Sequence, residues 1–256
     1  MKEMVLVSGG AGYIGSHTAV ELINAGYDVV VADNLSNSDM SGVEGVRKIT
    51  GVDVPFVNVD CCDKEAFRKV FEQYNFNSVI HFAAYKAVGE SVIDPMKYYR
   101  NNLTSFMNVV DLMREFSRPN IVFSSSATVY GEADELPVTE LTPRKPATSS
   151  YGNTKQMCED ILRDSVAAYG GEGLKGIALR YFNPIGAHPS ALIGELPRGV
   201  PQNLVPFITQ TAAGVVVLSG NNGAGFLCSG QNSFLVQRLQ APHIQNTGGN
   251  TFGFQL

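Results

Sequence analysis

A chain of 256 residues is long enough to bury a sizeable core and suits one nucleotide-binding domain with a modest appendage. Its 19 basic and 24 acidic side chains give a net charge of −5 with no block of like charge, which argues against nucleic acid or an anionic membrane as a partner. There is no signal-peptide pattern and no run of about 18 apolar residues, so we expect a cytoplasmic protein.

The first predicted element is an apolar strand over residues 5–8, followed by a glycine-rich turn and a helix. Three glycines follow the spacing G-x-x-G-x-x-G, at Gly9, Gly12 and Gly15. The first can adopt turn dihedrals closed to other residues, the second lets the backbone approach a pyrophosphate, and the third allows close packing of helix and strand. Because the helix would point unpaired N–H groups at an anion, the stretch predicts a phosphate-binding turn.

A second apolar strand, residues 29–32, ends at Asp33, about 20 residues beyond the glycine turn. A carboxylate at this distance is placed to meet the adenosine ribose hydroxyls of a dinucleotide. It would also repel a 2′-phosphate, and it therefore favours NAD over NADP.

Further strands are predicted at residues 54–59, 78–82, 120–123 and 175–180, and helical patterns separate them, the longest over residues 96–116. This alternation predicts an α/β fold: a Rossmann-like doubly wound parallel sheet covered on both faces. Asp60 could accept a hydrogen bond from adenine, or the region could simply cap a helix near Asp63. His81 lies inside an apolar strand, which favours a hydrogen-bonded core histidine over a catalytic base.

The proton-transfer groups are expected where strands end, because ligands bind at the carboxyl edge of an open parallel sheet. Ser126 follows the fifth strand, and a helix opening at Tyr151 carries Lys155 one turn later on the same face. A phenol holds its proton to about pH 10 and needs help to act as a base. The Lys155 ammonium and a positive nicotinamide ring would favour the phenolate, while Ser126 steadies the substrate oxygen.

Several motifs, in order and spacing, resemble the UDP-glucose 4-epimerase family of extended short-chain dehydrogenases/reductases over residues 1–213. They are GGAGYIGSH at 9–17, Asp33 with Asn34, HFAAYKAVGES at 81–91, SSSATVYG at 124–131, YGNTK at 151–155 and RYFNPIGAH at 180–188. The resemblance implies a tightly held NAD that takes hydride from C4 of a UDP-sugar and returns it to the other face. It implies UDP-galactose and UDP-glucose as substrates, and a homodimer packed through the helices at 96–116 and 151–168.

The resemblance also assigns roles to individual residues. Tyr151 would be the base, Lys155 its partner and Ser126 the hydroxyl aligner. The residues expected to line NAD, these three included, are Gly9, Gly12, Tyr13, Ile14, Gly15, Asp33, Asn34, Leu35, Ser36, Asn37, Ser38, Asp60, Cys61, Phe82, Ala83, Ala84, Lys86, Asn101 and Phe182. Those expected to meet the UDP-sugar are Lys86, Ser126, Tyr151, Asn183, Asn203 and Leu204.

Two other functions remain open at this point. A nucleotide-sugar 4,6-dehydratase shares the scaffold, but that family carries an acid pair after its catalytic serine or threonine, where this chain has Ala127 and Thr128. A non-catalytic NAD-binding protein is the other alternative. The four cysteines form no C-x-x-C pair and have no neighbouring histidine, so we expect free thiols and no metal site.

The predicted organisation is an NAD-binding domain at 1–185, the start of a substrate-binding segment at 186–213 and an atypical tail at 214–256. The tail contains a single charged residue, Arg238, and is rich in Gly, Asn and Gln. It lacks the arginines that the family uses for the pyrophosphate, as a truncated or frameshifted reading would. We therefore expect a poorly ordered or loosely packed tail and impaired epimerase activity.

Overall fold

The computed structural model describes residues 2–199, 201 and 203–214, and it divides into two units, Met1–Pro206 and Phe207–Leu256. Two predictions concern the tail at 214–256: its loose packing and its lack of the family's arginines. Apart from Gly214, the tail lies outside the described residues. The predicted boundaries at residues 185 and 213 likewise remain predictions.

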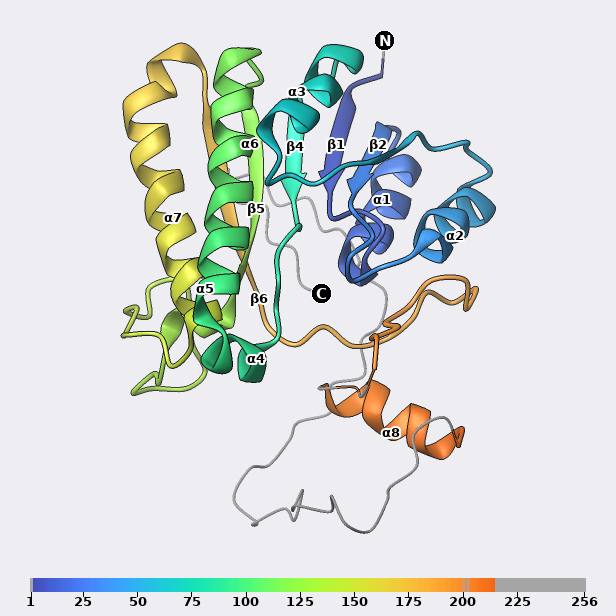
Figure 1. The fold of residues 1–256 in the computed structure, drawn as a ribbon, viewed down its shortest axis with the longest axis vertical. Coiled ribbons are helices and arrows are strands. Elements are labelled where there is room, and N and C mark those ends of the chain that lie inside the picture. The colour runs from blue at the N-terminus through green and yellow to red at the C-terminus, as the bar shows by residue number, and fades with distance from the viewer. Residues whose placement is uncertain (1, 200, 202, 215–256) are drawn as a thin grey trace. The chain divides into compact units, whose positions relative to one another are not determined.

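The first unit is built on a sheet of six parallel strands in the order β3-β2-β1-β4-β5-β6 (Figure 1). This order reverses direction between β1 and β4, which is the switch point where doubly wound folds bind ligands. The expected α/β class is confirmed. The strands are β1 Met4–Ser8, β2 Asp28–Asp33, β3 Phe56–Asn58, β4 Ser78–His81, β5 Asn120–Ser126 and β6 Lys175–Tyr181.

Helices and single helical turns connect these strands, and one helix, α8, follows the last strand. The α-helices are α1 Tyr13–Asn24, α2 Met40–Thr50, α3 Lys64–Gln73, α4 Val88–Ile93, α5 Pro95–Tyr98, α6 Thr104–Glu115, α7 Ser150–Tyr169 and α8 Leu204–Ala212. A π-helical turn, η1 Tyr99–Leu103, joins α5 to α6, and short 3₁₀ turns occupy η2 Ala127–Tyr130 and η3 Gly170–Glu172.

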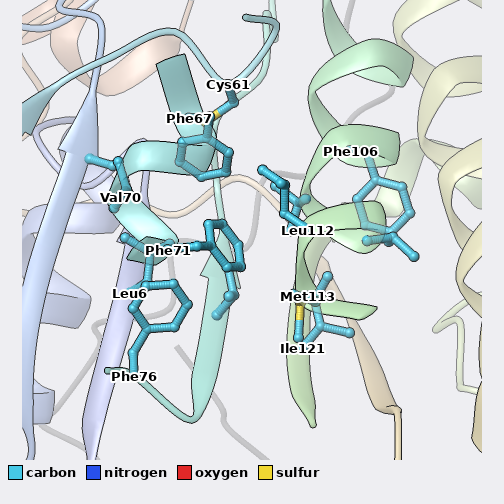
Figure 2. Close-up of a cluster of buried hydrophobic side chains, with 14 of the residues drawn as sticks. Leu6, Cys61, Phe67, Val70, Phe71, Phe76, Phe106, Leu112, Met113 and Ile121 are labelled. Carbon is cyan, nitrogen blue, oxygen red and sulfur yellow. The ribbon is translucent and has the colours of Figure 1, made fainter. Parts of the chain in front are cut away.

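Two apolar clusters hold the helices against the sheet. On one face α3, α6 and α7 bury a cluster that includes Phe67, Phe71 and Phe106 (Figure 2). On the other face α1 and α2 pack on β1 and β2 through residues such as Val20 and Val46. Burying a side chain of this size stabilises the fold by about 1.5–3 kcal/mol, so these clusters fix where the strand ends meet.

The face of the sheet that carries α1 and α2 was expected to be covered by helices along its full width, but the described helices cover only part of it. Among the described residues, the helices on that face lie over β1 to β3, and Ile177 of β6 remains 54% exposed. Neither cluster covers the carboxyl edge of the sheet, which is formed by loops. A ligand-binding site of an open parallel sheet is expected at this edge.

Three predicted elements differ from the structure. The strand expected at 54–59 is only Phe56–Asn58, and the helix expected at 96–116 is interrupted by the π turn. In that turn Asn102 points inward: its Oδ1 accepts from the Tyr85 N–H at 2.9 Å and its amide donates to Thr154 Oγ1 at 3.0 Å. Strand β5 runs three residues further than expected because residues 124–126 pair in register with residues 179–181 of β6. That pairing fixes the backbone of Ser126.

Candidate active site at the carboxyl edge of the sheet

The glycine turn after β1 is shaped by close backbone contacts. Gly9 has φ +73°, and a Cβ there would lie 2.6 Å from the Ala83 nitrogen, while a Cβ on Gly15 would lie 2.4 Å from the Gly9 oxygen. Gly12 is different, because the nearest atom to its Cβ would be the Gly9 oxygen at 3.3 Å. Gly9 and Gly15 are therefore required by the close backbone packing of the turn. Gly12 is not, and its outer side is open to a ligand.

Helix α1 starts directly from this turn without a polar cap. Gly12 is its N-cap residue, no side chain caps the helix, and no acidic residue occupies the first turn. The first N–H groups of a helix have no partner within it, and its N-terminus carries a partial positive charge. The turn is thus suited to hold an anion such as a diphosphate.

Asp33 ties the glycine turn to the loop that follows β2. Its Oδ2 accepts a hydrogen bond from the Ala11 N–H at 3.1 Å, and its Oδ1 accepts from the Leu35 N–H and the Ser38 hydroxyl, both at 2.9 Å. A carboxylate offers about four acceptor positions, so Oδ2 retains capacity for a ribose hydroxyl. Leu35 adopts φ +55°, a conformation that this network supports.

The sequence left open whether Asp60 contacts adenine or belongs to a helix cap near Asp63, and the structure distinguishes the two roles. Asp63 is the residue that caps α3, since it accepts from the Ala66 N–H at 3.0 Å. Asp60 instead accepts from the Cys62 N–H at 2.7 Å and from the Asn34 amide at 3.1 Å. It therefore lies beside the loop that Asp33 organises, and its contact with adenine remains a prediction.

Ser126 and Tyr151 come from different elements. Ser126 ends β5, and its Oγ accepts from the Thr128 N–H at 3.2 Å. Tyr151 lies in the first turn of α7, which is capped by the Ser149 hydroxyl accepting from the Gly152 N–H at 3.1 Å. Burial raises the pKa of the Tyr151 phenol, and a hydrogen bond with Ser126 partly opposes this rise. On its own the phenol is thus a poor base.

Lys155 lies one turn further along α7 and is almost completely buried. Its ammonium donates to the Ser124 carbonyl at 2.7 Å and lies 5.8 Å from the centre of the Tyr151 ring. Burial lowers the pKa of Lys155 to about 8. A cation held this close to a phenol favours the phenolate, which is the help that Tyr151 needs.

A partly buried ion pair that the sequence analysis missed connects α7 to the two strands beside it. Glu159 accepts from the Ser125 hydroxyl at 2.6 Å and from two nitrogens of Arg180, each at 2.9 Å. Burial raises the pKa of Glu159, but the hydrogen bonds from Arg180 and Ser125 outweigh it and hold the carboxyl below its usual range. Glu159 follows Lys155 by four residues, so helical spacing could have indicated it.

Glu195, in the segment after β6, brings together two of the expected ligand-binding residues. Its Oε1 lies 3.4 Å from the Lys86 ammonium and accepts a hydrogen bond from the Asn203 amide. The carboxylate itself is largely buried, with 10% of its side chain exposed. Glu195 was not among the predicted site residues, because no motif marked it.

Comparison with known proteins agrees with this geometry. The model of the NAD dependent epimerase/dehydratase family matches residues 5–223. The chain belongs to this family. The UDP-glucose 4-epimerase of Bacillus subtilis is 53% identical over 211 residues, covering 82% of this chain and 61% of that protein, and the one of Dictyostelium discoideum is 48% identical over 223 residues, covering 86% and 64%.

A solved structure is similar as well. UDP-glucose 4-epimerase from Bifidobacterium longum, in complex with NAD⁺ and UDP, matches with a TM-score of 0.81 at 47% identity, covering 83% of this chain and 63% of that one. The chain thus spans about three fifths of the length of the relatives it matches.

The structure also describes several of the other residues expected to meet the cofactor or the UDP-sugar. The backbone of Phe82 and Ala83 borders Gly9, and the Tyr13 hydroxyl donates to the Gly186 carbonyl at 2.7 Å. The Cys61 side chain points into the core (Figure 2) and is 5% exposed, so a ligand could reach only its backbone. Phe182 and Leu204 are 60% and 49% exposed, and Asn183 is exposed too.

Other expectations drawn from the sequence can be compared directly with the described residues. His81 is 2% exposed and its Nδ1 lies 2.7 Å from the Ser8 hydroxyl, which confirms a core histidine. Cys61, Cys62 and Cys158 are free thiols, whereas Cys228 lies outside the described residues. In the part of the chain that the structure describes, no group of three metal-ligating side chains is found, and no helix has the length and hydropathy to cross a membrane.

Proposed function

We propose that this chain binds NAD and interconverts UDP-galactose and UDP-glucose by inverting C4 of the sugar, with an activity impaired by the atypical sequence of residues 214–256. The observation that carries the proposal is that a turn suited to a dinucleotide and a set of proton-transfer residues lie at the same edge of the sheet. The uncapped α1 turn with Asp33 suits a dinucleotide, and Ser126, Tyr151 and Lys155 suit proton transfer beside it. The relatives from Bacillus subtilis and Dictyostelium discoideum are UDP-glucose 4-epimerases, which supports the same activity.

The cofactor proposal fits the residues present. Gly12 leaves room for a close approach, the α1 N-terminus offers N–H groups to the diphosphate, and Asp33 Oδ2 can accept from a ribose hydroxyl. A 2′-phosphate would meet the same carboxylate, so NAD is preferred over NADP. NAD supplies the hydride acceptor and donor for C4, while the protein supplies orientation and proton handling.

In this proposal Tyr151 accepts the proton of the C4 hydroxyl as the hydride leaves that carbon. Lys155 favours the phenolate form of Tyr151 that accepts this proton, and Ser126 hydrogen-bonds the reacting oxygen. The 4-keto sugar then rotates in the site so that its other face meets the hydride. As the hydride returns to C4, Tyr151 gives the proton back to the C4 oxygen, and the configuration at C4 is inverted. The expected contacts of Asn183, Asn203 and Leu204 with the UDP-sugar belong to the same proposal.

The reaction class can be tested by product analysis. Incubation of the pure protein and NAD with UDP-galactose should give UDP-glucose and no net redox change. Ala127 and Thr128 follow Ser126 in η2 and provide no carboxylate for removing water, so a 4-keto-6-deoxy sugar is not expected. That product would establish a dehydratase instead, and bound NAD with no product from either reaction would support a non-catalytic NAD-binding protein.

A homodimer through α6 and α7 is the second part of the proposal. Apolar side chains stay exposed on and near these helices, with Met107 at 44%, Met157 at 40% and Ile93 at 86%. Exposed apolar surface of this kind is typical of protein interfaces. Light scattering should therefore give twice the chain mass, and Met107→Glu should reduce it to the monomer mass. A monomeric wild-type protein would contradict this part alone.

A further inference from the structure

The segment of residues 186–199 leaves β6 and runs back across the carboxyl edge to the side of α2 (Figure 1). It was expected to begin a substrate-binding region. Its contacts connect it to the half of the fold that carries the glycine turn. The Tyr13 hydroxyl donates to the Gly186 carbonyl at 2.7 Å at one end of the segment.

The middle of the segment is anchored in the core. Ile193 is 4% exposed and belongs to the apolar cluster that contains Val43 and Val46 of α2. Helix α2 admits it only because position 45 is glycine: a Cβ there would lie 2.4 Å from Ile193 Cγ2 and 2.6 Å from the Leu192 oxygen. A side chain buried this completely fixes the position of its neighbours.

The far end of the segment reaches the loop after β2. Arg198 donates to the Ser36 carbonyl at 3.1 Å and also to the Ser38 carbonyl. The same loop is held from its other side by Asp33, which accepts from the Leu35 N–H and the Ser38 hydroxyl. Arg198 therefore completes a second set of contacts on the loop that would meet the adenosine ribose.

We infer that residues 186–199 form a brace for the adenosine-ribose loop, in which Ile193 anchors the segment and Arg198 holds the loop backbone. Both are positioning residues: they act on the cofactor through the Asn34–Ser38 loop. The inference rests on the proposed NAD site. Its consequence is that a segment entering from β6 controls how firmly the cofactor is retained.

The experiment measures two quantities on variants that should keep the fold. Arg198→Gln removes the charge-assisted hydrogen bonds and should weaken NAD binding about five-fold in a titration without sugar. Backbone amides of residues 35–39 should exchange with solvent faster in the NAD-free variant. Arg198→Lys, which keeps a cation but not the fork of donors, should fall between wild type and Arg198→Gln. The matched control is Arg163→Gln on α7, which should change neither quantity.

A second variant tests the anchor. Ile193→Ala should produce the same faster exchange at residues 35–39 with Arg198 still present, and thermal unfolding will show that the protein remains folded. The brace is wrong if Arg198→Gln leaves both NAD affinity and loop exchange at wild-type values. If the wild-type protein itself fails to bind NAD, the proposed function is wrong, while the exchange measurement still decides whether the brace exists.

Discussion

Replacing Tyr151 by phenylalanine should lower turnover of UDP-galactose by about 10³-fold and leave NAD affinity within about two-fold of wild type. Only the phenolic oxygen is lost, and that oxygen is the proton acceptor in the proposed reaction. In the proposed site the cofactor is held by many other groups, from the glycine turn to Asp33. Turnover can be followed by product formation and NAD affinity by titration on the same preparation.

Tyr169→Phe on the same helix provides the control for this variant. Tyr169 lies at the opposite end of α7, where its ring stacks with the Arg114 guanidinium, and its substitution should not change the rate. Near-normal turnover in Tyr151→Phe would mean that another group is the base.

Lys155→Met should abolish turnover and weaken NAD binding, while the free energy of unfolding at pH 7 stays within about 1 kcal/mol of wild type. Two effects oppose each other. Methionine leaves the Ser124 carbonyl without its donor, but it also removes a buried ammonium whose desolvation disfavours the folded state. A drop in activity without a drop in stability separates a chemical role of Lys155 from a structural one.

The pH dependence of stability gives a second measurement on the same variant. Burial lowers the pKa of Lys155 in the folded protein from its ordinary 10.5 to about 8. Between these two values the unfolded chain binds the extra proton, so wild-type stability should rise as pH increases through this window. Denaturant titrations should show that this contribution is missing in Lys155→Met. An identical pH profile for the two proteins would contradict the buried-cation account.

The sequence was sufficient to predict the parts of the fold that depend on strong local patterns. The glycine spacing, the apolar strands and the Tyr151–Lys155 pair on one helix turn all depend on short-range periodicity. Asp33 was predicted because it ends an apolar strand about 20 residues beyond the glycine turn. These features also lie at one sheet edge, as the parallel topology requires.

What the sequence did not predict depends on contacts between residues far apart in the chain. Glu159 pairs with Arg180 across α7 and β6, and Glu195 joins Lys86 to Asn203. The π turn at residues 99–103 depends on Asn102 bonding to Tyr85 and Thr154, which propensity does not encode. In the sequence Arg198 is a single arginine in a loop, and nothing near it in the chain indicates its hydrogen bonds to the distant Ser36 and Ser38 carbonyls.

The most direct test of the account uses UDP-galactose that carries deuterium at C4 of the sugar. The pure protein with NAD should convert it to UDP-glucose with the deuterium still at C4, because the hydride leaves and returns to the same carbon while Tyr151 moves only the hydroxyl proton. Mass spectrometry and proton NMR of the separated product read this out, with Tyr151→Phe as the background. UDP-glucose carrying hydrogen at C4, or a 4-keto-6-deoxy sugar, would contradict the account.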